Sequence, residues 1–310
     1  MSEKIKSKKE LEVLENEFKA LQKVAGDEAN KVIAIDKKGI NFDIFSALKA
    51  ALKLPGAKVD REKFLRKELI PYFEISKIDV AVNDNPAKAG MPLKIINKIA
   101  DNVIAYHKNI VSGLSFVTGL PGGFTYMVPA LSVDIVQYFY HIIKVVQKLA
   151  YLYGFDEFEF DDKDINSDTM NKILIFMGTM YGVNGANEGI KILSKVAEKN
   201  ISKTIAKQAL TKGTIYPIAK KILKTIGIKI TKQLFADAVG KVIPIIGGLI
   251  SGTITFTSFG ANCNELKKCL SKNEIANPSF YKKSKENYRT TYKNSLKLSS
   301  YKSELDKPLK

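Results

Sequence analysis

Histidine and cysteine are scarce in this chain of 310 residues, and each scarcity excludes a class of site. The two histidines, His107 and His141, are too few for a histidine-rich metal site unless carboxylates or cysteines complete it. The two cysteines, Cys263 and Cys269, cannot form a disulfide framework, and on one helix they would point to different faces. We therefore expect free thiols in a reducing compartment, with no metal site and no cofactor.

Arginine is nearly missing as well, since only three of the 49 basic residues are arginine. The guanidinium group is the side chain that forks best onto phosphates and base edges. Tyrosines and lysines do interleave between Tyr281 and Tyr301, a pattern that could stack on single strands. The shortage of arginine nevertheless argues against nucleic acid as a partner.

Several enzyme motifs are also missing. The sequence GVNGANEG before Ile190 and Lys191 lacks the order of a phosphate-binding loop, and no nucleophile elbow G-x-S-x-G occurs. The acidic run from Asp156 to Asp164 lacks the ligand order and central glycine of an EF-hand, which favours a solvated loop. The N-terminus alternates charges without the apolar core of a signal peptide, so we expect a cytoplasmic protein.

The net charge of +17 is concentrated in two segments. Residues 199–236 hold nine lysines and no acid, and residues 267–310 hold twelve basic and four acidic residues. Such a concentration favours an anionic partner, with lysine-biased decoration of solvated faces as the plain alternative. The lysines expected to contact an anionic membrane repeat along two amphipathic patterns: Lys195, Lys199, Lys203, Lys207, Lys221, Lys224 and Lys232.

Helical periodicity dominates the chain and predicts an all-α fold, a multi-helix bundle around glycine-rich hydrophobic central helices. We expect an amphipathic N-terminal helix within residues 1–38, running from Lys8 to about Ile35. A helical domain follows over residues 39–265, and residues 266–310 form a basic, flexible tail. Within the domain, Asp60 is expected to cap a short helix that Pro71 ends, and Gly154 to end a long one.

That long helix, which follows Pro129, carries a narrow polar stripe on an otherwise apolar cylinder. Its members are Asp134, Gln137, His141, Lys144 and Lys148. A helix with so little polar surface lies at the centre of a bundle or against lipid. Asp134 and His141 are two turns apart and could face one pocket, which makes them the candidate catalytic residues if the protein is an enzyme. A buried stripe satisfied by neighbouring helices is the alternative.

Two long stretches, Asn109 to Val133 and Val242 to Asn264, contain no charge. Each is longer than the roughly 20 residues that cross a bilayer, but Pro121, the Gly122–Gly123 pair and Pro129 should split the first. A helix pair folded at the LPGG sequence, or a re-entrant hairpin, fits better than a straight span. In the second stretch small residues recur every four positions, so that Gly247, Gly248 and Gly252 favour close helix packing. A packed core and partial insertion into lipid both remain open.

The same residues resemble a known family. GLSFVTGLPGGFTYMVPALSVDIVQYFYHIIKVVQKLAYLYGFD combines a glycine-rich lead-in, a Gly-Gly step, a proline before an aspartate, a long apolar helix and a final A-x-x-Y-G-F-D. It resembles the central signature of the EcsC family, and VGKVIPIIGGLISG resembles the second glycine-rich element of that family. The resemblance covers roughly residues 40 to 265. It implies a helical protein, encoded in the founding case beside an ABC transporter, and carries over no catalytic residue.

Three functions are therefore expected, in this order. The first is a non-enzymatic cytoplasmic protein that associates peripherally with the inner, anionic face of a membrane. The second is a soluble adaptor that docks on another protein such as an ABC transporter component. The third is an enzyme with a pocket around Asp134 and His141.

Overall fold

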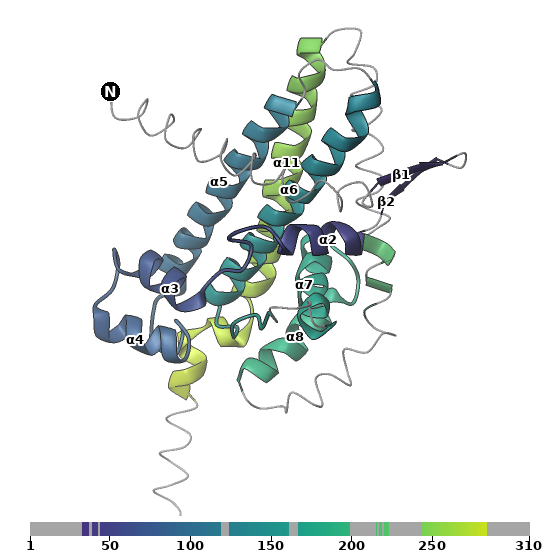
Figure 1. The fold of residues 1–310 in the computed structure, drawn as a ribbon. Helices are drawn as coiled ribbons and strands as arrows, with labels where there is room; N and C mark the ends of the chain where they lie inside the picture. Colours follow the sequence, from purple (N-terminus) through teal and green to yellow (C-terminus); the bar gives the residue numbers. More distant parts are fainter. Residues whose placement is uncertain are drawn as a thin grey trace, which may run out of the picture.

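The computed structural model describes residues 33–36, 39–42, 44–118, 124–160, 167–198, 215, 217–218, 220–222 and 244–283. Inside the long helices, the description of residues 112–118, 124–134 and 244–257 is limited to the backbone. The chain folds as a helical bundle, and the predicted all-α class is confirmed (Figure 1).

A small hairpin precedes the bundle. Strand β1 (Ile33–Asp36) pairs antiparallel with β2 (Gly39–Phe42), so that Ile33 faces Phe42 and Asp36 faces Gly39. The helix expected from Lys8 to about Ile35 is therefore wrong at its last three positions, and its remainder lies outside the described residues. Branched isoleucines alternate in β1, a pattern that suits a pleated strand better than a helix.

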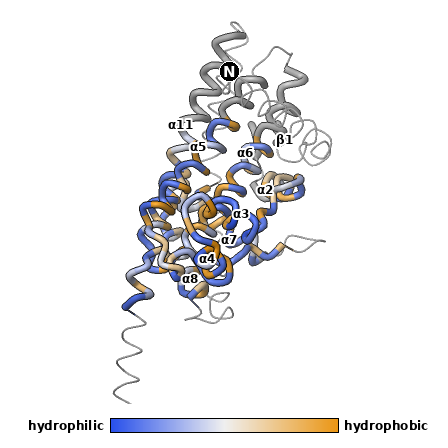
Figure 2. Tube along the Cα trace, turned by 90° about the vertical axis from the view of Figure 1, so that its left-hand side faces the viewer, coloured by the Kyte–Doolittle hydropathy of each residue, from blue (hydrophilic) through white to orange (hydrophobic). Residues whose placement is uncertain are grey.

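Three long helices form the centre of the bundle: α5 (Leu93–Thr118), α6 (Phe124–Leu152) and α11 (Pro244–Ser271). They run side by side in both views of the trace (Figures 1 and 2). α5 ends at Thr118 and α6 begins at Phe124, on the two sides of the LPGG sequence, which itself lies outside the described residues, so the predicted fold at LPGG stays a prediction. Pro129, however, does not divide the chain again. It removes only one backbone donor in the second turn of α6, and the helix continues to Leu152.

The register of these helices brings the two uncharged stretches together. The ammonium of Lys267 lies 2.6 Å from a carboxylate oxygen of Asp101, and a Cβ atom on Gly260 would lie 2.9 Å from Lys108 Cδ. α11 therefore runs antiparallel to α5, and its first half lies beside the second half of α5. Residues 109–118, 124–133 and 244–259 thus share one end of the bundle, which we call the charge-free end (Figure 1).

Shorter helices surround the other end. They are α2 (Ile44–Leu52), α3 (Arg61–Leu69), α4 (Ile75–Asn83), α7 (Ser167–Met180) and α8 (Ala186–Ala197). As predicted, Asp60 caps α3, accepting a hydrogen bond of 2.8 Å from the backbone N–H of Lys63, and α3 ends before Pro71. Gly154 follows α6 with a φ of +95°, which confirms it as the left-handed stop.

The glycine-rich sequence between α7 and α8 is a turn, as predicted, and it contains two residues with positive φ, Gly182 and Gly185. The glycines that permit close helix packing here are others. A Cβ atom on Gly178 would lie 2.9 Å from the Cβ of Ala186, and one on Gly189 would lie 2.8 Å from Ile175. These two glycines let α7 and α8 pack with little space between their backbones.

The chain after residue 265 is not simply a tail. α11 continues to Ser271, a short 3₁₀ turn η1 (Glu274–Ala276) follows, and Leu270 and Ile275 are buried. The side-chain amide of Asn85 donates to the hydroxyl of Tyr281 over 3.1 Å, which ties this segment to the chain after α4. The predicted boundary between residues 265 and 266 is therefore wrong, because apolar side chains continue the bundle to about residue 281. Residues 284–310 lie outside the described part of the chain.

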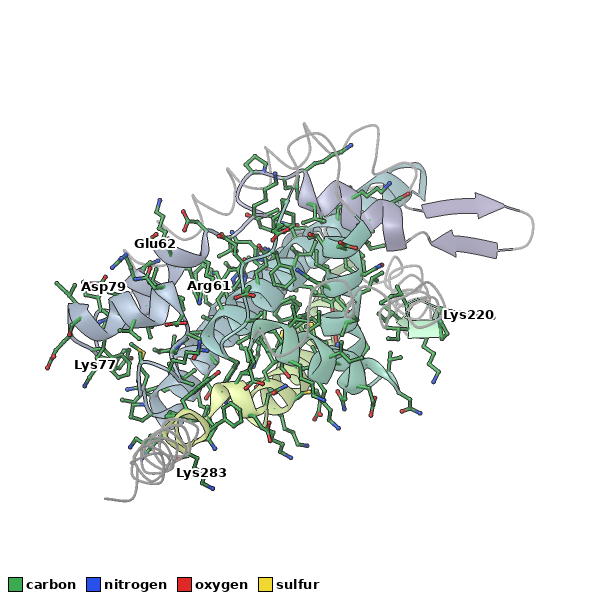
Figure 3. The ribbon with its side chains drawn as sticks, turned by 90° about the horizontal axis from the view of Figure 1, so that it is seen from below. Arg61, Glu62, Lys77, Asp79, Lys220 and Lys283 are labelled. Atoms are coloured by element: carbon green, nitrogen blue, oxygen red, sulfur yellow. The ribbon has the colours of Figure 1, made fainter. Side chains whose placement is uncertain are left out.

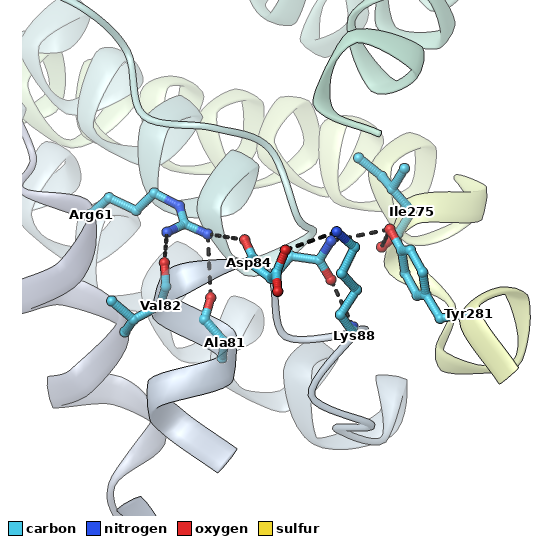
Figure 4. Close-up of polar contacts among 8 residues, drawn as sticks. Arg61, Ala81, Val82, Asp84, Lys88, Ile275 and Tyr281 are labelled. Atoms are coloured by element: carbon cyan, nitrogen blue, oxygen red, sulfur yellow. Dashed lines mark hydrogen bonds and ion pairs between the residues drawn. The ribbon is translucent and has the colours of Figure 1, made fainter. Parts of the chain in front are cut away.

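One buried arginine joins several of these elements. Arg61, at the start of α3, points into the molecule while its neighbour Glu62 lies at the edge (Figure 3). Its guanidinium group donates to the backbone carbonyls of Ala81, Val82 and Asp84 at the end of α4 (Figure 4), and to that of Phe155 after α6. The carbonyls of Ala81 and Val82 are among the last four of α4, which have no intrahelical donor, so Arg61 caps α4 from outside.

Candidate functional site

The most unusual polar group in the described part of the chain lies between α5 and α6. His107 on α5 and His141 on α6 have their Nδ1 atoms 3.0 Å apart, and their side chains are 1% and 2% exposed. The rings meet at an angle of 60° with centroids 5.2 Å apart. The two histidines of the chain are thus a single buried pair.

A lysine, Lys148, contacts the histidine pair at His107. The ammonium of Lys148 lies 2.9 Å from Nε2 of His107. It also lies 5.8 Å from the ring centre of Phe64 and 5.7 Å from that of Tyr106, within the range of a cation–π contact. Aromatic faces and an imidazole therefore hold Lys148 close to the histidine pair.

The position of Lys148 decides which nitrogen atoms carry hydrogen. An ammonium group can only donate, so Nε2 of His107 must accept and the hydrogen of the neutral ring must be on Nδ1. His107 Nδ1 then donates to Nδ1 of His141, which leaves the hydrogen of His141 on Nε2. The chain of hydrogen bonds runs in one direction, from Lys148 through His107 to His141.

Both imidazoles are held neutral by their surroundings. Burial lowers the pKa of His107 far below its usual value, and Lys148, His141 and Lys144 lower it further. Burial also lowers the pKa of His141 to about 3, with Lys144 and Lys148 acting in the same direction. A neutral imidazole is the form that the network requires, because each ring accepts one hydrogen bond at a nitrogen without hydrogen.

The directed chain ends at Nε2 of His141, for which the described residues offer no acceptor. Among the described residues, no group accepts from Nε2 of His141 or from the side-chain nitrogen of Gln137, one turn earlier on α6, and both atoms are buried. A buried donor left without a partner costs about 1 to 3 kcal/mol, and native proteins contain few of them. Two on adjacent turns of one helix mark this region as a candidate binding site.

Of the two candidate catalytic residues, only the side chain of His141 lies in the described part of the chain. His141 belongs to the site, but the side chain of Asp134 lies outside the described residues, although its backbone lies in α6. The partner of His141 is His107, which sequence reasoning did not place in the site. A signal for it exists, because His107 continues the apolar repeat of Ile96, Val103 and Ile104 on α5 and therefore faces the core.

The lysines and glycines predicted to bind membrane and to pack helices are mostly beyond what the structure describes. Lys195 and Lys221 are exposed, whereas Lys199, Lys203, Lys207, Lys224 and Lys232 lie outside the described residues. Gly122 and Gly123 lie outside them too. Gly247, Gly248 and Gly252 are in the first half of α11, described by backbone alone. Their predicted packing role stays a prediction.

Two further properties bear on function. Cys263 is a buried free thiol whose pKa burial raises, and Cys269 is a partly buried one. In the described part of the chain, no three histidine, cysteine or carboxylate side chains are grouped as metal ligands would be. In the same residues, no helix has both the length and the apolar character needed to cross a membrane.

Comparison of the chain with protein-family models, with curated proteins and with solved structures finds no match. The resemblance to the EcsC family therefore stays a prediction that rests on the quoted motifs. Function has to be argued from the arrangement of the chain itself.

Proposed function

We propose that this protein binds peripherally to an anionic membrane surface through the charge-free end of its central bundle. The observation that carries the proposal is the antiparallel register of α5 and α11. Because Lys267 pairs with Asp101 and Gly260 lies against Lys108, two uncharged stretches far apart in the sequence lie at the same end. Uncharged, largely apolar helix ends can enter the interface of a bilayer without desolvating a charge.

A positively charged segment of the sequence closely precedes the uncharged first half of α11. Residues 199–236, with a net charge of +9, lead through only seven further residues into Pro244, the first residue of α11. Apolar surface next to a lysine-rich segment is the composition that binds anionic leaflets, where each lysine near the surface contributes about 1 kcal/mol. The enzyme hypothesis finds no comparable support, since His141 is paired with a second neutral imidazole.

The test is sedimentation of the full chain with vesicles. We expect binding to phosphatidylglycerol–phosphatidylcholine vesicles and none to pure phosphatidylcholine. The triple variant Lys199→Glu, Lys203→Glu, Lys207→Glu should weaken binding on the order of a hundredfold, since three lysines contribute about 1 kcal/mol each. A matched control is Lys63→Glu, Lys67→Glu, Lys77→Glu. These exposed lysines lie on α3 and α4, of which α3 packs through Phe64 against Tyr151 in the last turn of α6, and Lys77 projects from the edge of the molecule (Figure 3).

Insertion can be tested separately because the chain contains no tryptophan. A single tryptophan at Phe124, the first residue of α6, should shift its emission to the blue and be quenched by brominated lipid on binding. One at Tyr72, exposed between α3 and α4, should do neither. Equal binding to both vesicle types, or equal behaviour of the two tryptophans, would contradict the proposal.

A second function, an adaptor docking on a protein such as a transporter component, is favoured by a different feature. Ile70 and Ile75 are 63% and 67% exposed, and with Tyr72 they form an apolar corner between α3 and α4. Exposed apolar patches of this kind are found in protein interfaces. The adaptor hypothesis predicts no vesicle binding and a complex with its partner that Ile70→Glu and Ile75→Glu disrupt.

A further inference from the structure

We propose that the end of the bundle opposite the charge-free end binds a second anionic membrane, so that the protein bridges two membranes. This end, which we call the basic end, consists of the last turns of α11 and residues 272–283. The two segments that carry the whole net charge of +17, residues 199–236 and 267–310, are attached to opposite ends of α11. Bridging rests on the proposed function, in which the charge-free end enters the first membrane.

The two ends are too far apart for one membrane to attract both. α11 has 28 residues, which at about 1.5 Å per residue gives a length of about 42 Å. The ion pair between Lys267 and Asp101 fixes its direction, with Pro244 at the charge-free end and Ser271 at the other. Because α5, α6 and α11 run side by side, entry of the charge-free end into a membrane points the basic end away from it (Figures 1 and 2). Charges are screened within about 8 Å at physiological ionic strength, so the basic end lies beyond the field of that membrane.

The segment after α11 is held against the bundle. Ile275 in η1 is buried, and the hydroxyl of Tyr281 accepts a hydrogen bond of 3.1 Å from the side chain of Asn85. The ammonium of Lys88 lies 5.7 Å from the ring centre of Tyr281 (Figure 4). These contacts fix the place from which the next residues project, and Lys283 lies there beside the end of α11 (Figure 3).

The carboxylates at the basic end do not cancel its lysines. Those paired with lysines there are Asp84 with Lys88, Asp101 with Lys267 and Glu265 with Lys268. α8 and the residue after it carry two lysines and two glutamates. Glu274 is exposed, but so are Lys272, Lys282 and Lys283, with which no carboxylate of the described residues forms an ion pair. Residues 285–310 add seven basic and three acidic residues to this excess.

The composition of this end favours lipid headgroups over nucleic acid. From residue 265 to residue 283 every basic residue is lysine, a compact point charge that suits headgroups free to rearrange, whereas arginine is the better fork for phosphates and base edges. The aromatic rings of Phe280 and Tyr281, with centroids 5.2 Å apart, directly precede Lys282 and Lys283. Aromatic rings beside lysines are typical of the interface between a membrane and water.

Retention of one vesicle population by another tests bridging with the full chain. Phosphatidylglycerol–phosphatidylcholine vesicles are immobilised, loaded with protein and washed, and fluorescent free vesicles are then added. We expect retention of free vesicles that contain phosphatidylglycerol and no retention of pure phosphatidylcholine vesicles. Retention should fall as salt is raised, because exposed charges carry the second contact.

Two charge reversals at the basic end separate the two contacts. The variant Lys282→Glu, Lys283→Glu should lower retention of free vesicles at least about tenfold, because lysines near an anionic surface each strengthen binding several-fold. Its sedimentation with a single vesicle population should stay close to that of the unmodified chain. The matched control is Lys49→Glu, Lys53→Glu. These exposed lysines lie beside the middle of α6, where Tyr140 donates to the carbonyl of Pro55, and their reversal should leave retention unchanged.

The outcomes distinguish failure of bridging from failure of the proposed function. Sedimentation without retention of free vesicles would overturn bridging and leave the proposed function intact, whereas absence of sedimentation would contradict both. Retention unchanged in the Lys282→Glu, Lys283→Glu variant would show that the vesicles are joined in another way, such as by association of two copies, and would overturn the proposal. So would binding of a uridylate oligonucleotide that this variant abolishes while free vesicles are not retained, because the surface would then belong to nucleic acid.

Discussion

A terminal guanidinium nitrogen of Arg61 lies 2.5 Å from the carbonyl oxygen of Val82, so the first residue of α3 caps the last turn of α4. The same side chain reaches Asp84 and, beyond α4, the carbonyl of Phe155. Three elements of the fold therefore meet on one buried side chain.

Arg61→Lys should destabilise the protein. A lysine keeps the charge but cannot donate in a planar fork to carbonyls on different elements, so several buried carbonyls lose their donors. We expect a loss of about 2 to 4 kcal/mol in the free energy of unfolding, measured by urea denaturation. Arg66→Lys is the matched control, because Arg66 is partly exposed and its ion pairs with Glu62 and Asp79 lie at the surface. A loss below about 0.5 kcal/mol is expected there.

Two glutamines on α6 should respond in different ways to the same substitution. The side chain of Gln147 donates to the carbonyl of Ala57 over 2.7 Å and accepts from the backbone N–H of Val59 over 2.9 Å, which holds the segment before α3 against α6. Gln147→Leu leaves both backbone groups buried without partners and should cost about 2 to 4 kcal/mol. Gln137→Leu removes a side-chain nitrogen for which the described residues offer no acceptor, so its effect on thermal unfolding should be small or stabilising. Equal losses would contradict this account.

The buried histidines should make stability depend on pH. The pKa of His141 is lowered to about 3 and that of His107 also lies well below 6.5, whereas in the unfolded chain both bind protons near pH 6.5. Between these values the unfolded state binds protons that the folded state does not. The free energy of unfolding therefore falls as pH is lowered, by about 1.4 kcal/mol per pH unit for each histidine.

Urea denaturation at about pH 7 and about pH 5 measures this slope in a window where most carboxylates remain ionised. His141→Phe removes one of the two titrating groups and should reduce the slope by about half. A slope unchanged in that variant would show that other groups cause it.

Two helical glycines should tolerate alanine unequally. A Cβ atom at Gly178 would lie 2.9 Å from the Cβ of Ala186 and 2.8 Å from Ile218, so Gly178→Ala forces α7 and α8 apart. A loss of about 1 to 3 kcal/mol is expected. At Gly260 the close atom belongs to the flexible side chain of Lys108, which can move. Gly260→Ala should therefore gain up to about 1 kcal/mol from helix propensity, as thermal unfolding of the pair would measure.

Much of this architecture could be predicted from local patterns. The cap at Asp60, the stop at Gly154 and the turn between α7 and α8 all depend on a few neighbouring residues whose conformational preferences are strong. The wrong predictions concern segments whose structure depends on contacts with residues distant in the sequence. Residues 266–281 extend the bundle because Asn85 and the hydrophobic core contact them, and β1 forms because Gly39–Phe42 pairs with it.

The candidate site was predicted only in part for the same reason. His141 stands out on α6 because few polar residues interrupt that helix. Its contact with His107 depends on how α5 packs against α6, and the hydrogen on each ring depends on a third residue, Lys148. No spacing within one helix encodes such a relationship.

The pairing of Lys267 with Asp101 joins residues 166 positions apart, which has a consequence for the order of events during synthesis. α5 and α6 leave the ribosome long before α11 exists, so for that interval the flank of α5 that α11 will cover lacks its partner. Contacts of such long sequence separation form late and slowly. We expect the nascent chain to remain a chaperone substrate until α11, which ends at Ser271, has emerged.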